Sequence, residues 1–115
     1  MAITIYGIKN CDTMKKARAF LDRKRVSYAF HDYKVSGIDK GKLEGWVKKA
    51  GWEVLLNRAG TTFRKLTEKE KAGVNEKKAI ALMLEQPSMI KRPVLELPGG
   101  KLIVGFKPEE YQKAV

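Results

Sequence analysis

Apolar and polar side chains change period several times along the first third of the chain. Residues 3–6 alternate, which predicts a short strand, and Gly7 then releases the backbone into a turn. From Cys11 the apolar residues recur at helical spacing, with basic residues on the other side, and we expect this helix to end near residues 24–25. Residues 26–33 alternate again, so a strand, a helix and a second strand imply a right-handed parallel unit.

The middle of the chain has the periodicity and the capping residues of helices. Asp39 can cap a helix that Gly51 is placed to end. The segment 67–70, Thr-Glu-Lys-Glu, has capping-box spacing for a short helix. Asn75 can cap a longer helix that Pro87 stops. We therefore expect several consecutive helices in this region.

The last part of the chain returns to strands. Val94–Leu97 and Leu102–Val104 flank the turn Pro98–Lys101 and predict a hairpin of antiparallel strands. Pro108, followed by two glutamates, starts a last helix.

These elements predict an α/β fold in the order βαβ, helices, ββα, with one four-stranded mixed sheet. A chain of 115 residues suits one domain, and no internal repeat or Pro/Ser-rich linker divides it. We expect a single domain over residues 1–115 with a helical insertion at about 37–88.

The composition is strongly basic. Lys and Arg number 24 against 13 Asp and Glu, a formal net charge of +11. This charge favours an acidic partner: an acidic protein surface, a phosphorylated or carboxylated small molecule, or nucleic acid. The basic residues of the first helix fall on its solvent side and Trp46 falls on an apolar helical face, so nucleic acid is not the partner we expect.

The chain carries no recognisable targeting signal. Its N-terminal segment lacks the basic and long apolar regions of a signal peptide, and no apolar run is long enough to span a bilayer. One cysteine cannot form an internal disulfide, and an accessible thiol needs a reducing compartment. We therefore expect a cytoplasmic protein of bacterial type with no membrane partner.

Cys11 is the candidate reactive group because it stands at the predicted start of a helix. The unpaired N–H groups and partial positive charge there lower a thiol pKa, and only the thiolate is nucleophilic. Lys15 and Lys16 add positive potential, whereas Asp12 acts in the opposite direction. The alternative is a small buried core residue. Met14 stands where a Cys-x-x-Cys motif has its second thiol, so another molecule must resolve any disulfide that forms.

The sequence argues against a metal site. One histidine, His31, and one cysteine cannot supply the ligands of a zinc site of usual composition. His31 is conceivable as a general base for Cys11, but its place in a predicted strand favours a packed or edge residue.

Four groups of motifs, spread over most of the chain, resemble the ArsC/Spx family of thioredoxin-fold proteins and its YffB-like branch. They are Tyr-Gly-Ile-Lys-Asn-Cys-Asp-Thr at 6–13, Asn-Arg at 57–58 with Thr-Thr-Phe-Arg-Lys-Leu at 61–66, Ile-Lys-Arg-Pro-Val at 90–94, and Val-Gly-Phe-Lys-Pro at 104–108. In glutaredoxin-coupled arsenate reductases of this family, a cysteine attacks an oxyanion held by three arginines, and glutathione then forms a mixed disulfide with the product.

The resemblance implies a site residue by residue. The nucleophile is Cys11, and Lys107 stands where the family enzyme has its third arginine, which puts a point charge in place of a planar fork. A cis bond between Arg92 and Pro93 is also implied. The predicted substrate- and glutathione-binding residues are Asn10, Thr13, Arg58, Arg92, Pro93 and Lys107.

Two functions of different classes follow. The first is a glutathione-dependent thiol reductase with Cys11 as its single nucleophile, related to arsenate reductases but, because of Lys107, not a dedicated arsenate reductase. Its co-substrate is glutathione or another small thiol, and glutaredoxin is a further candidate partner. The alternative is a non-enzymatic, Spx-like docking or regulatory protein that binds RNA polymerase or another acidic partner, although Met14 rules out the Cys-x-x-Cys switch of Spx regulators.

Overall fold

The computed structural model describes residues 3–115, so Met1 and Ala2, which open the segment considered above for a signal peptide, lie outside the described residues. The chain divides into two compact units. The sheet unit comprises the residues up to Ser36 together with Arg92–Val115, and the helical unit comprises Gly37–Lys91.

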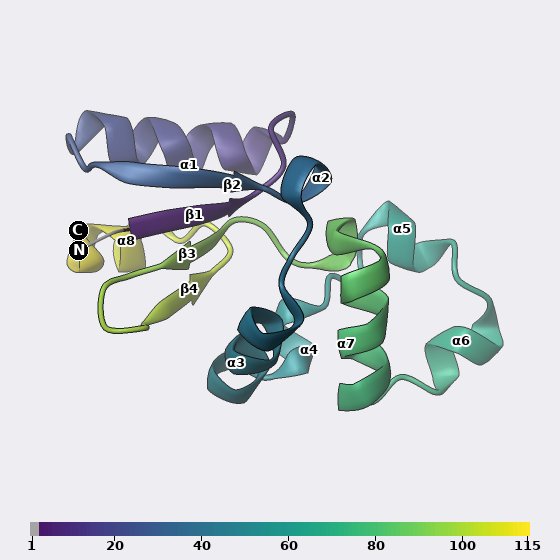
Figure 1. Cartoon of the computed structure of the whole chain (residues 1–115). Coiled ribbons are helices and arrows are strands. Elements are labelled where there is room, and N and C mark those ends of the chain that lie inside the picture. The colour runs from purple at the N-terminus through teal and green to yellow at the C-terminus, as the bar shows by residue number, and fades with distance from the viewer. Residues whose placement is uncertain (1–2) are drawn as a thin grey trace. The chain divides into compact units, whose positions relative to one another are not determined.

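Within residues 3–115, four strands form the sheet: β1 (Ile3–Gly7), β2 (Tyr28–Asp32), β3 (Val94–Glu96) and β4 (Leu102–Val104). Their order is β2-β1-β3-β4 (Figure 1). Strand β1 is parallel to β2 and antiparallel to β3, which is antiparallel to β4. Helix α1 (Asp12–Arg23) connects the two parallel strands. The predicted mixed sheet, the parallel pair and the late hairpin are confirmed.

Helices α1 and α8 (Pro108–Ala114) cover one face of the sheet. Ile5, Leu95 and Ile103 stand opposite one another on adjacent strands, so their side chains share that face. They belong to one buried cluster with Met14, Ala17, Leu21 and Tyr111. Each large apolar side chain buried in this way contributes about 1.5–3 kcal/mol, which fixes the amphipathic helix α1 on the sheet.

Strand β2 is shorter than the predicted segment 26–33, and both ends have a physical cause. Arg25 takes a positive φ of 57°, and the N–H of Val26 bonds back into α1 at 3.0 Å, so the exit from the helix uses these residues. At the other end, the Asp32 carboxylate accepts a hydrogen bond of 2.9 Å from the backbone N–H of Lys34. The chain turns there into the short helix α2 (Tyr33–Ser36).

One basic residue of α1 departs from the predicted solvent side. The Nε of Arg18 donates to the hydroxyl of Tyr28 at 3.3 Å, and its guanidinium carbon lies 4.5 Å from the centre of the Phe30 ring. Arg18 is therefore half-buried and joins α1 to β2.

The helical unit contains α3 (Lys40–Ala50), α4 (Trp52–Leu55), α5 (Thr61–Arg64), α6 (Glu68–Ala72), α7 (Glu76–Glu85) and the 3₁₀ turn η1 (Pro87–Met89). The predicted caps are confirmed: the carboxylate of Asp39 accepts an N–H of α3 at 3.0 Å, and the side chain of Asn75 accepts one of α7 at 2.9 Å. Gly51 ends α3 with a φ of 91°. Helices α2, α4 and α5 and the turn η1 were not predicted, because segments this short show no helical periodicity.

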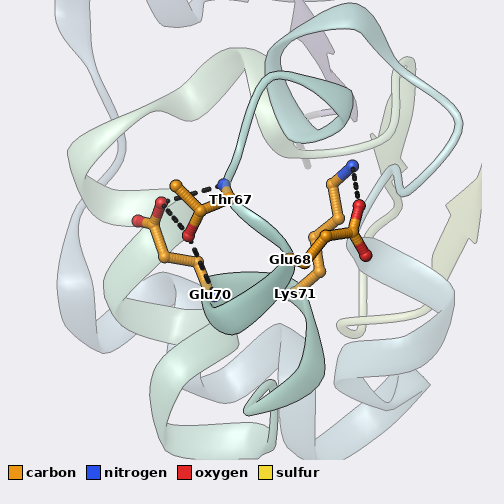
Figure 2. A network of polar contacts seen from close by, with 4 residues as sticks. All are labelled: Thr67, Glu68, Glu70 and Lys71. Carbon is orange, nitrogen blue, oxygen red and sulfur yellow. Dashed lines mark hydrogen bonds and ion pairs between the residues drawn. The ribbon is translucent and has the colours of Figure 1, made fainter.

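The capping box at the start of α6 is also confirmed (Figure 2). The Thr67 hydroxyl accepts the N–H of Glu70 at 3.2 Å, and the Glu70 carboxylate accepts the N–H of Thr67 at 3.1 Å. The two hydrogen bonds from Thr67 lower the pKa of the Glu70 carboxyl. An ion pair of 3.9 Å between Lys71 and Glu68 lies on the same helix.

Trp46 is 2% exposed in the core of the helical unit, which confirms it as a packing residue. Its buried companions in that unit include Leu43, Val47, Leu55, Phe63 and Met83. No helix within residues 3–115 has the length and apolar character needed to cross a membrane.

Candidate active site

Strand pairing brings four connecting segments of the sheet unit to one edge of the sheet. Gly7 at the end of β1 pairs with Asp32 at the end of β2, and Tyr6 pairs with Val94 at the start of β3. Val94 also pairs with Val104 at the end of β4. The chain therefore leaves β1, β2 and β4 and enters β3 at the same edge. These connecting segments carry Cys11, Tyr33, Arg92 and Lys107.

Cys11 is the N-cap residue of α1. Its backbone is extended, with φ −135° and ψ 127°, and its carbonyl accepts the N–H of Lys15 at 2.9 Å. The thiol is free and half-buried, packed against the rim of the sheet-unit core. The predicted place at the helix start is confirmed, and the alternative of a fully buried core cysteine is wrong.

Several groups set the pKa of the Cys11 thiol. Partial burial raises the pKa, but the N–H of Met14, the guanidinium of Arg92 and the N–H of Thr13 stabilise the thiolate more strongly. The net result is a pKa lowered from the usual value of a cysteine. The backbone N–H groups of the first turn of α1 therefore stabilise the thiolate together with the guanidinium of Arg92.

Arg92 supplies the positive charge at this thiol. Its guanidinium hydrogen-bonds to the Cys11 sulfur and also attracts the thiolate through its charge. The peptide bond between Arg92 and Pro93 is cis, as the resemblance implies, and the buried Pro93 accepts the N–H of Gly105 on its carbonyl at 2.8 Å. The two lysines at 15–16 are exposed, where solvent and salt screen their charge. The site thus combines a nucleophile with an adjacent anion-binding fork.

Lys107 is placed differently from Arg92. It is the N-cap residue of α8, its side chain is 63% exposed, and its Nζ lies 3.6 Å from a carboxylate oxygen of Glu110. The structure gives no interaction between Lys107 and Cys11 within residues 3–115. Its role in binding substrate therefore stays a prediction.

The other predicted binding residues lie in different surroundings. Thr13 acts on the thiol through its backbone, while its side chain is exposed. Asn10 is exposed in the loop before α1. Arg58 belongs to the helical unit, where its guanidinium carbon lies 6.0 Å from the centre of the Trp52 ring. The binding roles of Asn10 and Arg58 stay predictions.

Met14 occupies the place of a second thiol and packs against the end of β1. It is 1% exposed, and a Cβ built on Gly7 would collide with its Sδ and Cε atoms. Gly7 is the last residue of β1, so it is needed for the space that Met14 fills rather than for the turn predicted there.

Tyr33 is the residue near this edge that the sequence patterns missed. It is 2% exposed, and burial, with a smaller effect of Tyr6, raises its pKa well above the usual value, while Arg92 opposes the shift. The ring of His31 lies 4.9 Å from that of Tyr6 and 6.1 Å from that of Tyr33, which confirms His31 as a packed residue. The available signal was an aromatic residue directly after a strand that ends at this edge.

Residues 3–115 contain no group of three or more His, Cys, Asp and Glu side chains placed to hold a metal ion. The chemistry that the described residues offer is that of a thiolate held beside a guanidinium.

Comparison with known proteins gives a consistent set of relatives. The model of the ArsC family matches residues 6–114. A solved structure named YFFB protein is 61% identical, covers 98% of both chains and superimposes with a TM-score of 0.94. The solution structure of an arsenate reductase (ArsC) related protein from Brucella melitensis is 58% identical, covers 98% of this chain and 93% of its own, and has a TM-score of 0.79. The global transcriptional regulator Spx of Streptococcus pneumoniae is 23% identical over 96% of this chain and 83% of its own length.

Proposed function

The chain belongs to the ArsC family, and from this premise we propose that it is a glutathione-dependent thiol reductase with Cys11 as its nucleophile. The observation that carries the proposal is the lowered pKa of a half-exposed thiol at a helix N-terminus, with Arg92 beside it. Only the thiolate attacks disulfides, so a lowered pKa increases the reactive fraction at neutral pH.

The proposed reaction is a pair of thiol–disulfide exchanges. The Cys11 thiolate attacks the glutathione sulfur of a mixed disulfide between glutathione and a substrate thiol, a bond from Cys11 to glutathione forms, and the substrate leaves as its thiolate. A second glutathione thiolate then attacks the bound glutathione sulfur and regenerates the Cys11 thiolate. One substrate disulfide is reduced while two glutathione molecules end as oxidised glutathione, so electrons balance. Glutaredoxin is a candidate to replace the second glutathione.

Arg92 has two parts in this scheme. It stabilises the thiolate before attack, and its fork suits a glutathione carboxylate or another anion at the sulfur. We assign supporting contacts with substrate or glutathione to Asn10, Thr13, Arg58, Pro93 and Lys107.

The lysine at position 107 makes a dedicated arsenate reductase a poorer proposal than a thiol reductase. A single ammonium gives a point charge where a planar guanidinium binds two oxygens of an oxyanion. In this protein Lys107 is also paired with Glu110 at 3.6 Å, which reduces the charge available to a ligand.

Reduced thiols and glutathione point to the cytoplasm as the compartment of this activity. The second candidate is a docking protein for RNA polymerase or another acidic partner. It is favoured by the net charge of +11 and by the relationship to Spx regulators. The docking function predicts that partner binding is kept in Cys11→Ser, whereas reductase activity is lost in this variant.

The decisive experiment is mass spectrometry of the protein after incubation with oxidised glutathione. We expect one glutathione on Cys11, removed by excess reduced glutathione, and no adduct on Cys11→Ser. Turnover of a glutathionylated peptide is expected for the natural protein and absent in the variant. The proposal is wrong if Cys11→Ser keeps full activity, or if the natural thiol titrates at an ordinary pKa and forms no adduct.

A further inference from the structure

A surface hollow lies between α1 and the start of α8, within the sheet unit. It has a volume of about 590 Å³, and its lining residues are Lys16, Ala19, Phe20, Arg23, Phe106 and Pro108. Four of these six residues are apolar, and the rings of Phe20 and Phe106 meet edge to face at 5.9 Å. The hollow is therefore lined mainly by apolar side chains.

The α1 side of this hollow is positively charged. Arg23 also lines a neighbouring hollow with Phe20 and Lys24, so the cations continue along the helix. Lys16, Arg23 and Lys24 are exposed, and none of them forms an ion pair with another residue in the range 3–115. From Lys16 to Arg23 the helix rises about 10 Å, the length of about three residues of extended peptide.

The α8 side has the opposite character. Phe106 and Pro108 line a further hollow together with Lys107, Glu109 and Glu110. Lys107 is paired with Glu110, so this side offers carboxylates and little free positive charge. The charge of this surface thus changes sign across its width, with cations on α1 and carboxylates on α8.

We infer that this hollow, named here the α1–α8 groove, binds an acidic protein segment that inserts an apolar side chain. The apolar lining accepts one aromatic or aliphatic side chain, and acidic residues beside that side chain face the cations of α1. The exposed large apolar residues of the described chain, Val35 and Val54, lie elsewhere. Binding here does not require the Cys11 thiol.

The test uses the full protein and a defined probe, the peptide Ac-Glu-Asp-Phe-Leu-Asp-Glu-NH2, titrated in ¹H–¹⁵N NMR spectra. We expect shifts confined to α1 and the segment 105–111. The double variant R23E/K24E should weaken affinity about tenfold. Ala19→Gln, which fills part of the hollow without removing a cation, should also weaken the affinity. A peptide with Gln and Asn in place of the acids should bind weakly.

The matched control is K48E/K77E, which removes the same charge from exposed positions of the helical unit. It should bind the probe like the natural protein, and so should Cys11→Ser. Equal weakening by K48E/K77E means non-specific attraction and overturns the inference. Absence of shifts in α1, or tighter binding to anionic vesicles or DNA that R23E/K24E abolishes, also overturns it. Loss of probe binding leaves the reductase proposal intact, because that proposal is measured on Cys11.

Discussion

Replacing Met14 by cysteine should give this protein a reversible internal disulfide. Positions 11 and 14 are the N-cap and the third residue of α1, less than one helical turn apart, a spacing at which two Cα atoms can lie within the roughly 4.4–6.8 Å that a disulfide requires. Because Met14 is 1% exposed, the change removes two buried methylene-sized groups at about 0.8 kcal/mol each and leaves a small cavity. We expect the reduced variant to be about 2–3 kcal/mol less stable than the natural protein.

Oxidation of the two thiols to a disulfide should restore most of the lost stability. Closing a loop over residues 11–14 stabilises by about 2 kcal/mol in the chain-entropy treatment. The assay is urea denaturation with and without dithiothreitol, together with a count of free thiols. Met83→Cys is the control, because Met83 is 0% exposed in α7 and should lose similar stability without any response to reductant. A Met14→Cys variant that keeps two free thiols under oxidising conditions, or a reduced form as stable as the natural protein, refutes the reasoning.

Four further predictions follow from the described contacts. Arg92→Met should raise the pKa of Cys11, seen as an upward shift in the pH dependence of iodoacetamide alkylation, while the neighbouring Lys91→Met leaves it unchanged. Because the folded protein holds this thiol at a lowered pKa, it binds fewer protons than the unfolded chain between the two pKa values. Stability relative to Cys11→Ser should therefore rise with pH across that window and be lost as pH falls through the folded pKa, measured by urea titrations at several pH values. Asp39→Ala should cost about 1 kcal/mol in the same assay, and a loss below a few tenths contradicts its capping role. Gly7→Ala should cost about 1–3 kcal/mol through its collision with the side chain packed on it, so an unchanged denaturation midpoint argues against the close packing.

The elements that sequence patterns predicted correctly are those with a local physical cause. Asp39, Thr67 and Asn75 each satisfy N–H groups within three residues of themselves, so their positions mark helix starts without reference to the rest of the chain. The end of β2 depended instead on the turn that Asp32 makes after it, and the need for Gly7 depended on a side chain seven residues away. Such contacts are set by tertiary packing and leave no periodic signal.

The same distinction explains which charge acts on the thiol. By sequence, the lysines at 15–16 are much nearer to Cys11 than Arg92 is, yet it is the Arg92 guanidinium that forms a hydrogen bond with the sulfur. Strand pairing decides this, because β1 runs antiparallel to β3 and the start of β3 therefore lies beside the loop that carries the thiol. A half-buried guanidinium acts through a medium of lower effective dielectric than water, whereas the exposed lysines are screened. The excess of positive charge in the composition is therefore not what lowers the pKa of the cysteine; the N–H groups of the first turn and one arginine, which the sheet places beside the sulfur, lower it.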